Sequence, residues 1–161
     1  MDRTLVLVKP GAVQRGIVGA VISRLENKGL KIVGMKMLTM SQPLAREFYA
    51  VHEEKDFYVP LVKFMVSGPV VAMALEAPGA VGIVRNLLGT AKAGDAAAGT
   101  IRGDFALSNR CNVLHASDNN DTAARELALM FADGELMDYE KPSEPWTWCD
   151  VDICPGEPVG Y

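Results

Sequence analysis

The chain has 161 residues, of which 49% are hydrophobic and 22% are charged, a composition typical of one globular domain with a sizeable core. Its net charge of -4 argues against nucleic-acid binding driven by phosphate neutralisation, because such proteins are usually basic. No apolar run reaches the roughly eighteen residues of a membrane-spanning helix, so we expect none.

The three cysteines, Cys111, Cys149 and Cys154, are odd in number and scattered. Disulfide frameworks and zinc sites need paired cysteines at closer spacing. We therefore expect reduced thiols and a cytoplasmic location. The chain has only two histidines, and these side chains together predict no closed metal cluster.

The first predicted elements are a strand and a helix. Residues 4–8 form a continuous apolar run, which indicates a buried strand ending at Lys9. Apolar side chains at helical spacing then predict a helix over residues 18–25. Gly29 suits the left-handed residue that commonly follows a helix.

A second strand is predicted over residues 30–40, followed by a helix that Ser41 can cap. We expect this helix to carry Tyr49 and His52. Two glutamates follow His52 directly, which favours a solvated, partly exposed histidine.

A further short helix is predicted over residues 57–65, and Phe57 and Leu61 share one of its faces because they lie four residues apart. A third strand follows at residues 70–75. Residues 81–88 then predict a helix, in which Arg85 lies off the apolar stripe.

Glycine, alanine and polar residues dominate positions 89–99, which indicates a loop. Another turn is expected at Gly103-Asp104. Val113 and Leu114 then predict a short buried strand, and residues 122–131 a last helix. From Lys141 onward prolines and glycines interrupt any pattern.

His115 is expected where this short strand breaks into the turn before the last helix. Asn112, Ser117, Asp118 and Glu126 are all close in sequence and can hydrogen-bond an imidazole. When an acceptor holds one ring nitrogen, the other lone pair is free to act as a base, a metal ligand or a nucleophile.

The pattern Asn112-x-x-His115-x-Ser117-Asp118 resembles the active-site signature of the nucleoside diphosphate kinase family. Further stretches match that family in chain order: Val8-Lys9-Pro10, Gln14-Arg15-Gly16, Ser67-Gly68-Pro69-Val70 and residues 99–105. The resemblance covers residues 2–148. It implies one domain over 1–148 and an irregular tail over 149–161.

The resemblance implies an α/β (α+β) fold, with a ferredoxin-like βαββαβ core and a four-stranded antiparallel sheet covered by helices. It also implies a homo-oligomer, a hexamer or tetramer built on a dimer. Nucleoside di- and triphosphates are the expected partners, with no membrane association and nucleic acid unlikely.

The same resemblance identifies His115 as the phosphate-accepting nucleophile, oriented by Glu126 and Ser117, with Lys9 assisting at the phosphates. It assigns substrate contacts to eight residues: Lys9, Tyr49, Phe57, Leu61, Arg85, Ala91, Arg102 and Asn112. Phe57 and Leu61 would stack on the base, and stacking tolerates every base. Ala91 stands where the family usually has threonine, and Ala93 and Ala98 stand where it has prolines.

The implied reaction is ping-pong transfer of a γ-phosphate through a phosphohistidine on His115, with Mg²⁺ carried by the nucleotide. The chain has no Gly-x-x-x-x-Gly-Lys-[Ser/Thr] loop and no protein-kinase set of loops. A hydrolase triad is disfavoured because Ser117 lies two residues from His115 without a nucleophile elbow. One alternative is a catalytically weakened nucleotide-binding or scaffold protein of the same fold.

Overall fold

The computed structural model describes residues 1–148, and the prediction of an irregular tail at 149–161 lies outside this range. Its four strands are β1 (Asp2–Val8), β2 (Lys31–Leu38), β3 (Val70–Ala77) and β4 (Leu114–Ala116). They form one sheet in the order β2-β3-β1-β4, with every neighbouring pair antiparallel. This is the predicted ferredoxin-like arrangement, and the fold prediction is confirmed.

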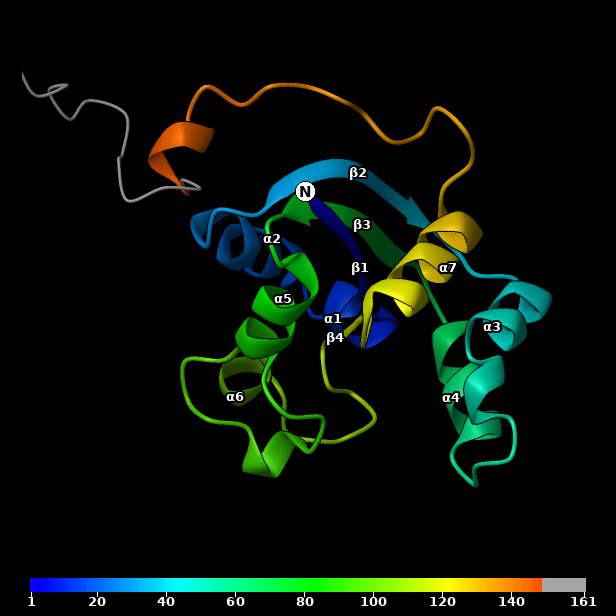
Figure 1. The fold of residues 1–161 in the computed structure, drawn as a ribbon. Coiled ribbons are helices and arrows are strands. Elements are labelled where there is room, and N and C mark those ends of the chain that lie inside the picture. Colours follow the sequence, from blue (N-terminus) through cyan, green and yellow to red (C-terminus); the bar gives the residue numbers. More distant parts are fainter. Residues whose placement is uncertain (149–161) are drawn as a thin grey trace, which may run out of the picture.

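The described helices connect these strands in chain order: α1 (Pro10–Gln14), α2 (Val18–Asn27), α3 (Gln42–Phe48), α4 (Tyr58–Met65), α5 (Ala80–Leu88), α6 (Ile101–Phe105) and α7 (Asn120–Met130). Short 3-10 turns occur at Ala50–His52, Ala93–Asp95 and Glu144–Trp146. Figure 1 shows α2 and α5 on one face of the sheet and α7 on the other. Among residues 1–148, no helix is long and apolar enough to cross a bilayer.

Strand β1 lies inside the sheet and contributes to both halves of the core. Val6 and Val8 pack with α2 and α5, whereas Leu5 and Leu7 pack with α3, α4 and α7. Successive side chains of a strand point to opposite faces, so a continuous apolar run fits a strand that is covered on both sides.

Several boundaries differ from the sequence prediction. Helix α3 ends at Phe48, so Tyr49 is its C-terminal cap and His52 lies in the following 3-10 turn. The predicted helix through both residues is therefore wrong. The predicted turn at Gly103-Asp104 lies within α6, which Thr100 caps by accepting a hydrogen bond from Gly103 N.

Val113 was expected in the last strand, but its φ of +73° excludes it, and β4 begins at Leu114. Leu114 N donates to Asn112 O at 2.9 Å, so Val113 is the central residue of a γ-turn. A positive φ is strained for a β-branched side chain, and apolar patterning does not indicate it.

The segment after α7 runs back across β2, as Figure 1 shows. Met137 N donates to Val33 O at 2.7 Å, and the Tyr139 hydroxyl donates to Ile32 O at 2.9 Å. Lys31 Nζ then lies 3.0 Å from a carboxylate oxygen of Glu144. These contacts place residues 137–144 along the first half of the β2 edge.

Leu75→Ala should lower the free energy of unfolding by about 2–5 kcal/mol, because this β3 side chain is fully buried in the core between the sheet and helices α2 and α5. Val51→Ala is the control, since 67% of the Val51 surface is exposed and this change should alter stability by less than about 0.5 kcal/mol. Urea unfolding at one protein concentration measures both. Equal losses would contradict this description of the core.

Candidate active site

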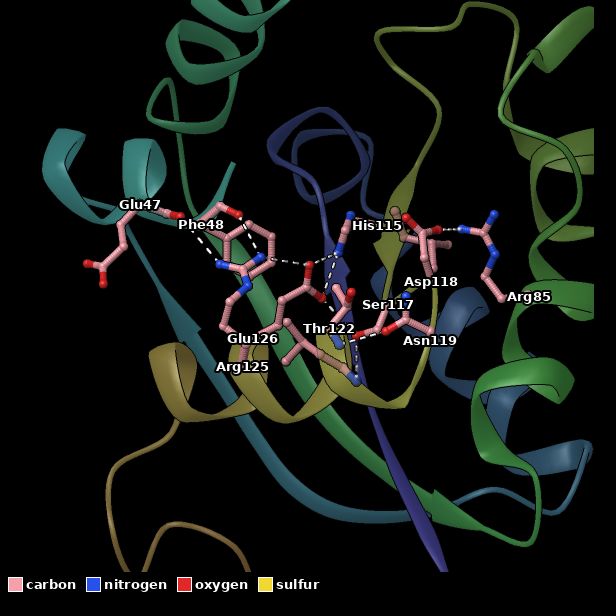
Figure 2. Close-up of polar contacts among 12 residues, drawn as sticks. Glu47, Phe48, Arg85, His115, Ser117, Asp118, Asn119, Thr122, Arg125 and Glu126 are labelled. Carbon is pink, nitrogen blue, oxygen red and sulfur yellow. Dashed lines mark hydrogen bonds and ion pairs between the residues drawn. The ribbon is translucent and has the colours of Figure 1, made fainter. Parts of the chain in front are cut away.

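His115 is the middle residue of β4 and is held by that strand's pairing with β1, opposite Leu7. Its Nε2 lies 3.0 and 2.9 Å from the two carboxylate oxygens of Glu126, which belongs to α7 (Figure 2). A carboxylate only accepts, so Nε2 carries the proton and Nδ1 keeps a lone pair. Within residues 1–148, Nδ1 makes no hydrogen bond, and the ring lines a cleft.

Glu126 is buried, with 2% of its surface exposed, and Ser117 is completely buried. The Ser117 hydroxyl donates to Glu126 Oε2 at 2.7 Å and accepts from Leu5 N at 3.4 Å. Ser117 N donates to Leu5 O, so β1 fixes the serine through its backbone as well. The carboxylate is thus held in place by a side chain that is itself held by the sheet.

The neighbouring Arg125 was missed by the sequence analysis. Its Nη2 lies 3.7 Å from Glu126 Oε1 and donates to Phe48 O at 3.2 Å (Figure 2). It therefore links α7 to the end of α3. Nothing in the sequence pattern distinguishes it from an ordinary surface arginine.

Two aromatic rings pack edge-on against the His115 ring. Their centroids lie 5.1 Å (Phe48) and 5.8 Å (Tyr49) from that of the imidazole. Burial raises the pKa of the Tyr49 phenol, which therefore stays protonated at neutral pH. Its hydroxyl is buried and has no partner within residues 1–148, although Tyr49 lines the cleft. Such a hydroxyl is available to donate a hydrogen bond to a ligand bound in the cleft.

Lys9 lies at the end of β1 with 7% of its surface exposed, and its Nζ donates to Asn112 Oδ1 at 2.6 Å. The pKa of its ammonium group is lowered from 10.5 to about 8, chiefly by burial and then by the charge of Arg102, with Cys111 acting in the opposite direction. Lys9 is therefore mostly charged at neutral pH, and the charge is poorly solvated.

Arg102 is also buried and donates to three backbone carbonyls: Asn112 O at 3.3 Å, Gly89 O at 3.0 Å and Leu114 O at 3.1 Å. Burial and the charge of Arg85 lower its pKa to about 10, while Asp118 acts in the opposite direction. The guanidinium thus clamps both ends of the strained turn at Val113. It joins that turn to the start of loop 89–99.

Arg85 lies on α5 and pairs with Asp118 at 2.5 Å, with both side chains largely exposed (Figure 2). Neither Arg85 nor Arg102 lines the main cleft in this structure. Arg85 and Asp118 nevertheless lie near enough to Arg102 to act on the pKa of its guanidinium, which Arg85 lowers and Asp118 raises.

The cleft that His115 lines has a volume of about 540 Å³. It brings together six further residues that the sequence analysis singled out for the substrate: Lys9, Tyr49, Phe57, Leu61, Ala91 and Asn112. His52 lines it too, half-buried beside Tyr49 and Phe57. Lys92, Asn109 and Arg110 complete the lining and were missed, because loop positions carry no periodic signal.

Loop 89–99 is tied to the strand that leads to His115. Ala93 N donates to Asn109 Oδ1 at 2.9 Å, and Asn112 Nδ2 donates to Ala91 O at 3.4 Å. Together with the bond from Arg102 to Gly89, these contacts hold a loop that lacks the family's two prolines. Within residues 1–148, no group of three or more His, Cys, Asp or Glu side chains is arranged to hold a metal ion.

A ferredoxin-like domain with an oriented histidine, buried cations and an apolar cleft mouth can bind an anionic ligand beside a nucleophilic side chain. Comparison with known proteins agrees with this class. The sequence model of the family described as "Nucleoside diphosphate kinase" matches residues 2–136. The nucleoside diphosphate kinase of Archaeoglobus fulgidus is 52% identical over 148 residues, covering 92% of this chain and 98% of that protein.

The solved structure of a halophilic nucleoside diphosphate kinase from Halobacterium salinarum, in complex with CDP, superimposes with a TM-score of 0.89. It is 47% identical, and the match covers 91% of this chain and 98% of that one. The enzyme from Encephalitozoon cuniculi gives the same TM-score at 31% identity, over 92% of this chain and all of the other. The chain belongs to the nucleoside diphosphate kinase family and is a nucleotide-binding phosphotransferase.

The lowered pKa of Lys9 predicts how nucleotide affinity depends on pH. Phosphates favour the charged ammonium, so above pH 8 the free protein must first take up a proton. ADP affinity should be flat from pH 7 to 8 and then fall by up to about tenfold per pH unit. Calorimetric titration from pH 7 to 9.5 measures this.

Lys9→Met should bind ADP more weakly at pH 7 and show no such fall. Cys111→Ser is the control, because Cys111 acts electrostatically on Lys9. If Cys111→Ser abolished the fall, the dependence would belong to the cysteine rather than to Lys9.

Proposed function

We propose that this enzyme transfers the γ-phosphate of a nucleoside triphosphate to a nucleoside diphosphate by a ping-pong mechanism, through a phosphohistidine on His115. The observation that carries this proposal is the bond from Nε2–H to Glu126, which leaves the Nδ1 lone pair free in a ring that lines the cleft. Glu126 and Ser117 act as positioning residues.

In the first step, the Nδ1 lone pair forms a bond to the γ-phosphorus, and the bond from that phosphorus to the β,γ-bridging oxygen breaks. The diphosphate leaves with the electron pair. The Nε2 proton stays on the ring and continues to donate to Glu126, so the phosphorylated imidazole needs no further proton. A second diphosphate then takes the phosphoryl group by the reverse displacement.

The transferred group is strongly anionic, so its charge must be neutralised throughout. Lys9 supplies a poorly solvated cation at the cleft. Arg102 uses three of its five N–H groups on carbonyls and retains two for phosphate. Arg85 can exchange its exposed partner Asp118 for a phosphate oxygen, and Mg²⁺ arrives with the nucleotide as part of the substrate.

The remaining site residues would position the nucleotide. Tyr49 has an unpartnered hydroxyl that can donate to a phosphate oxygen, and Asn112 can contact the ribose. Phe57 and Leu61 stack on the base, which suits broad base specificity. Ala91 can contribute only its backbone, since it lacks the hydroxyl of the family's usual threonine.

The CDP complex of the Halobacterium salinarum relative supports nucleoside diphosphates as ligands of this cleft. We also propose a homo-oligomer, a hexamer or tetramer built on a dimer, in the cytoplasm. Met35 and Met37 on the edge strand β2 and the fully exposed Leu107 offer apolar surface for such contacts.

Incubation with γ-labelled ATP and Mg²⁺ should label the protein, and a chase with GDP should remove the label. His115→Ala should acquire no label and lose transfer, while its ADP affinity, measured by calorimetry, stays within about threefold, because the imidazole is not needed to neutralise the phosphates. Substantial turnover by this variant would contradict the proposal. If the wild-type protein bound nucleotide without becoming labelled, a binding or scaffold role would replace it.

Glu126→Gln tests the positioning role. The amide can donate to Nε2 and so favour the tautomer with the proton on Nδ1. In that tautomer Nδ1 has no lone pair with which to attack the phosphorus. Phosphoenzyme formation should slow by about a hundredfold, with ATP affinity little changed. Rapid-quench measurements over a range of ATP concentrations separate the rate of phosphoenzyme formation from the affinity for ATP. A loss of affinity alone would show that Glu126 serves binding instead.

A further inference from the structure

Arg125 on α7 contacts both of the structures that flank the His115 ring. Its Nη1 donates to Glu47 O at 3.4 Å and its Nη2 donates to Phe48 O at 3.2 Å (Figure 2). Nη2 also lies 3.7 Å from Oε1 of Glu126, whose carboxylate accepts from the histidine. One guanidinium therefore contacts the end of α3 and the buried partner of His115.

On the α3 side, the guanidinium binds the carbonyl end of a helix. Helix α3 ends at Phe48, so the carbonyls of Glu47 and Phe48 lie where helical hydrogen bonds run out. The planar fork of an arginine can reach two neighbouring acceptors, and a positive charge is favourable at a helix C-terminus. Phe48 and Tyr49 pack edge-on against the imidazole. Fixing the end of α3 therefore fixes the aromatic wall beside His115.

On the other side, the guanidinium supplies a positive charge to a carboxylate that is almost completely buried. Burial of a carboxylate is costly unless hydrogen bonds and a nearby cation compensate it. Among residues 1–148, Arg125 is the only arginine or lysine with a nitrogen within 4.0 Å of the Glu126 carboxylate. Successive side chains of a helix do not face each other. The bonds to the α3 carbonyls thus hold this guanidinium beside its neighbour's carboxylate.

We propose that Arg125 is a positioning residue for phosphotransfer, which joins the carboxylate partner of His115 and the aromatic wall beside it into one rigid unit. The inference rests on the proposed phosphohistidine mechanism. The unit keeps Nε2 of the imidazole on Glu126 and Nδ1 towards the cleft. Arg125 is not among the residues that line the cleft, so it acts through its neighbours and not by touching the nucleotide.

Rapid-quench labelling of the full-length protein over a range of concentrations of γ-labelled ATP tests this inference. Arg125→Met keeps the aliphatic stem but removes the charge and every donor. Phosphoenzyme formation should slow by about ten- to a hundredfold, because a small misplacement of a nucleophile is costly, whereas ATP affinity should stay within about threefold.

Arg125→Lys tests rescue by a conservative change. Its ammonium can stay beside Glu126 and donate to one carbonyl, but it lacks the fork that reaches both. This variant should therefore be slower than the wild-type protein and faster than Arg125→Met, with ATP affinity unchanged. It also provides the test if Arg125→Met fails to fold.

Arg46→Met is the matched control, because it also removes a positive charge from the last turn of α3. Arg46 is exposed, and within residues 1–148 its side chain makes no hydrogen bond or ion pair. Arg46→Met should form the phosphoenzyme at the wild-type rate.

¹⁵N NMR of the histidine-labelled protein without nucleotide gives a readout that a loss of stability alone would not change. In the wild-type protein, His115 should carry its proton on Nε2. In Arg125→Met the carboxylate is held less firmly, so part of the population should carry the proton on Nδ1. Urea unfolding confirms that the variant is folded under the conditions of the measurement.

A wild-type rate in Arg125→Met would overturn the inference and leave the phosphotransfer proposal intact. A rate for Arg125→Lys no higher than that of a folded Arg125→Met, or an unchanged imidazole tautomer, would overturn it as well. A loss of ATP affinity alone would show that Arg125 serves binding instead. If the wild-type protein itself acquired no label, the phosphotransfer proposal would fail, and this inference would fail with it.

Discussion

The hydrogen bond between His115 Nε2 and the buried Glu126 carboxylate is the interaction on which the site depends. A buried carboxylate is costly unless its oxygens are hydrogen-bonded, and here the Ser117 hydroxyl and His115 itself provide the partners. The bond fixes both the orientation of the ring and the nitrogen that carries the proton. In the proposed reaction, Lys9 can neutralise a phosphate beside the histidine only if Nδ1 faces the cleft.

The fold supplies this geometry through rigid elements. Strand β4 holds His115 against β1, and β1 also bonds to Ser117 and ends at Lys9. Arg102 donates to the carbonyls on both sides of the strained Val113 turn, so the chain can change direction immediately before His115. Strained backbone of this kind persists where surrounding contacts over-determine it. A loop without prolines is held by the same group of bonds.

Strong local patterns made much of the fold predictable. The apolar run at residues 4–8, the Ser41 cap and the Gly29 helix end all have direct counterparts in the structure. The positive φ of Val113 could not be predicted, since a β-branched residue in an apolar run indicates a strand. Motifs singled out the residues around His115, whereas Lys92, Asn109 and Arg110 line the cleft only because of which loops meet in space.

The functional assignments to individual residues stay predictions, and one of them tests the central claim most directly. Two-dimensional ¹H–¹⁵N and ³¹P NMR of the phosphorylated protein, labelled with ¹⁵N-histidine, can identify which imidazole nitrogen is bonded to phosphorus. Because Glu126 occupies Nε2, the phosphoryl group should be on Nδ1 of His115. Phosphate on Nε2, or on His52, would contradict the account.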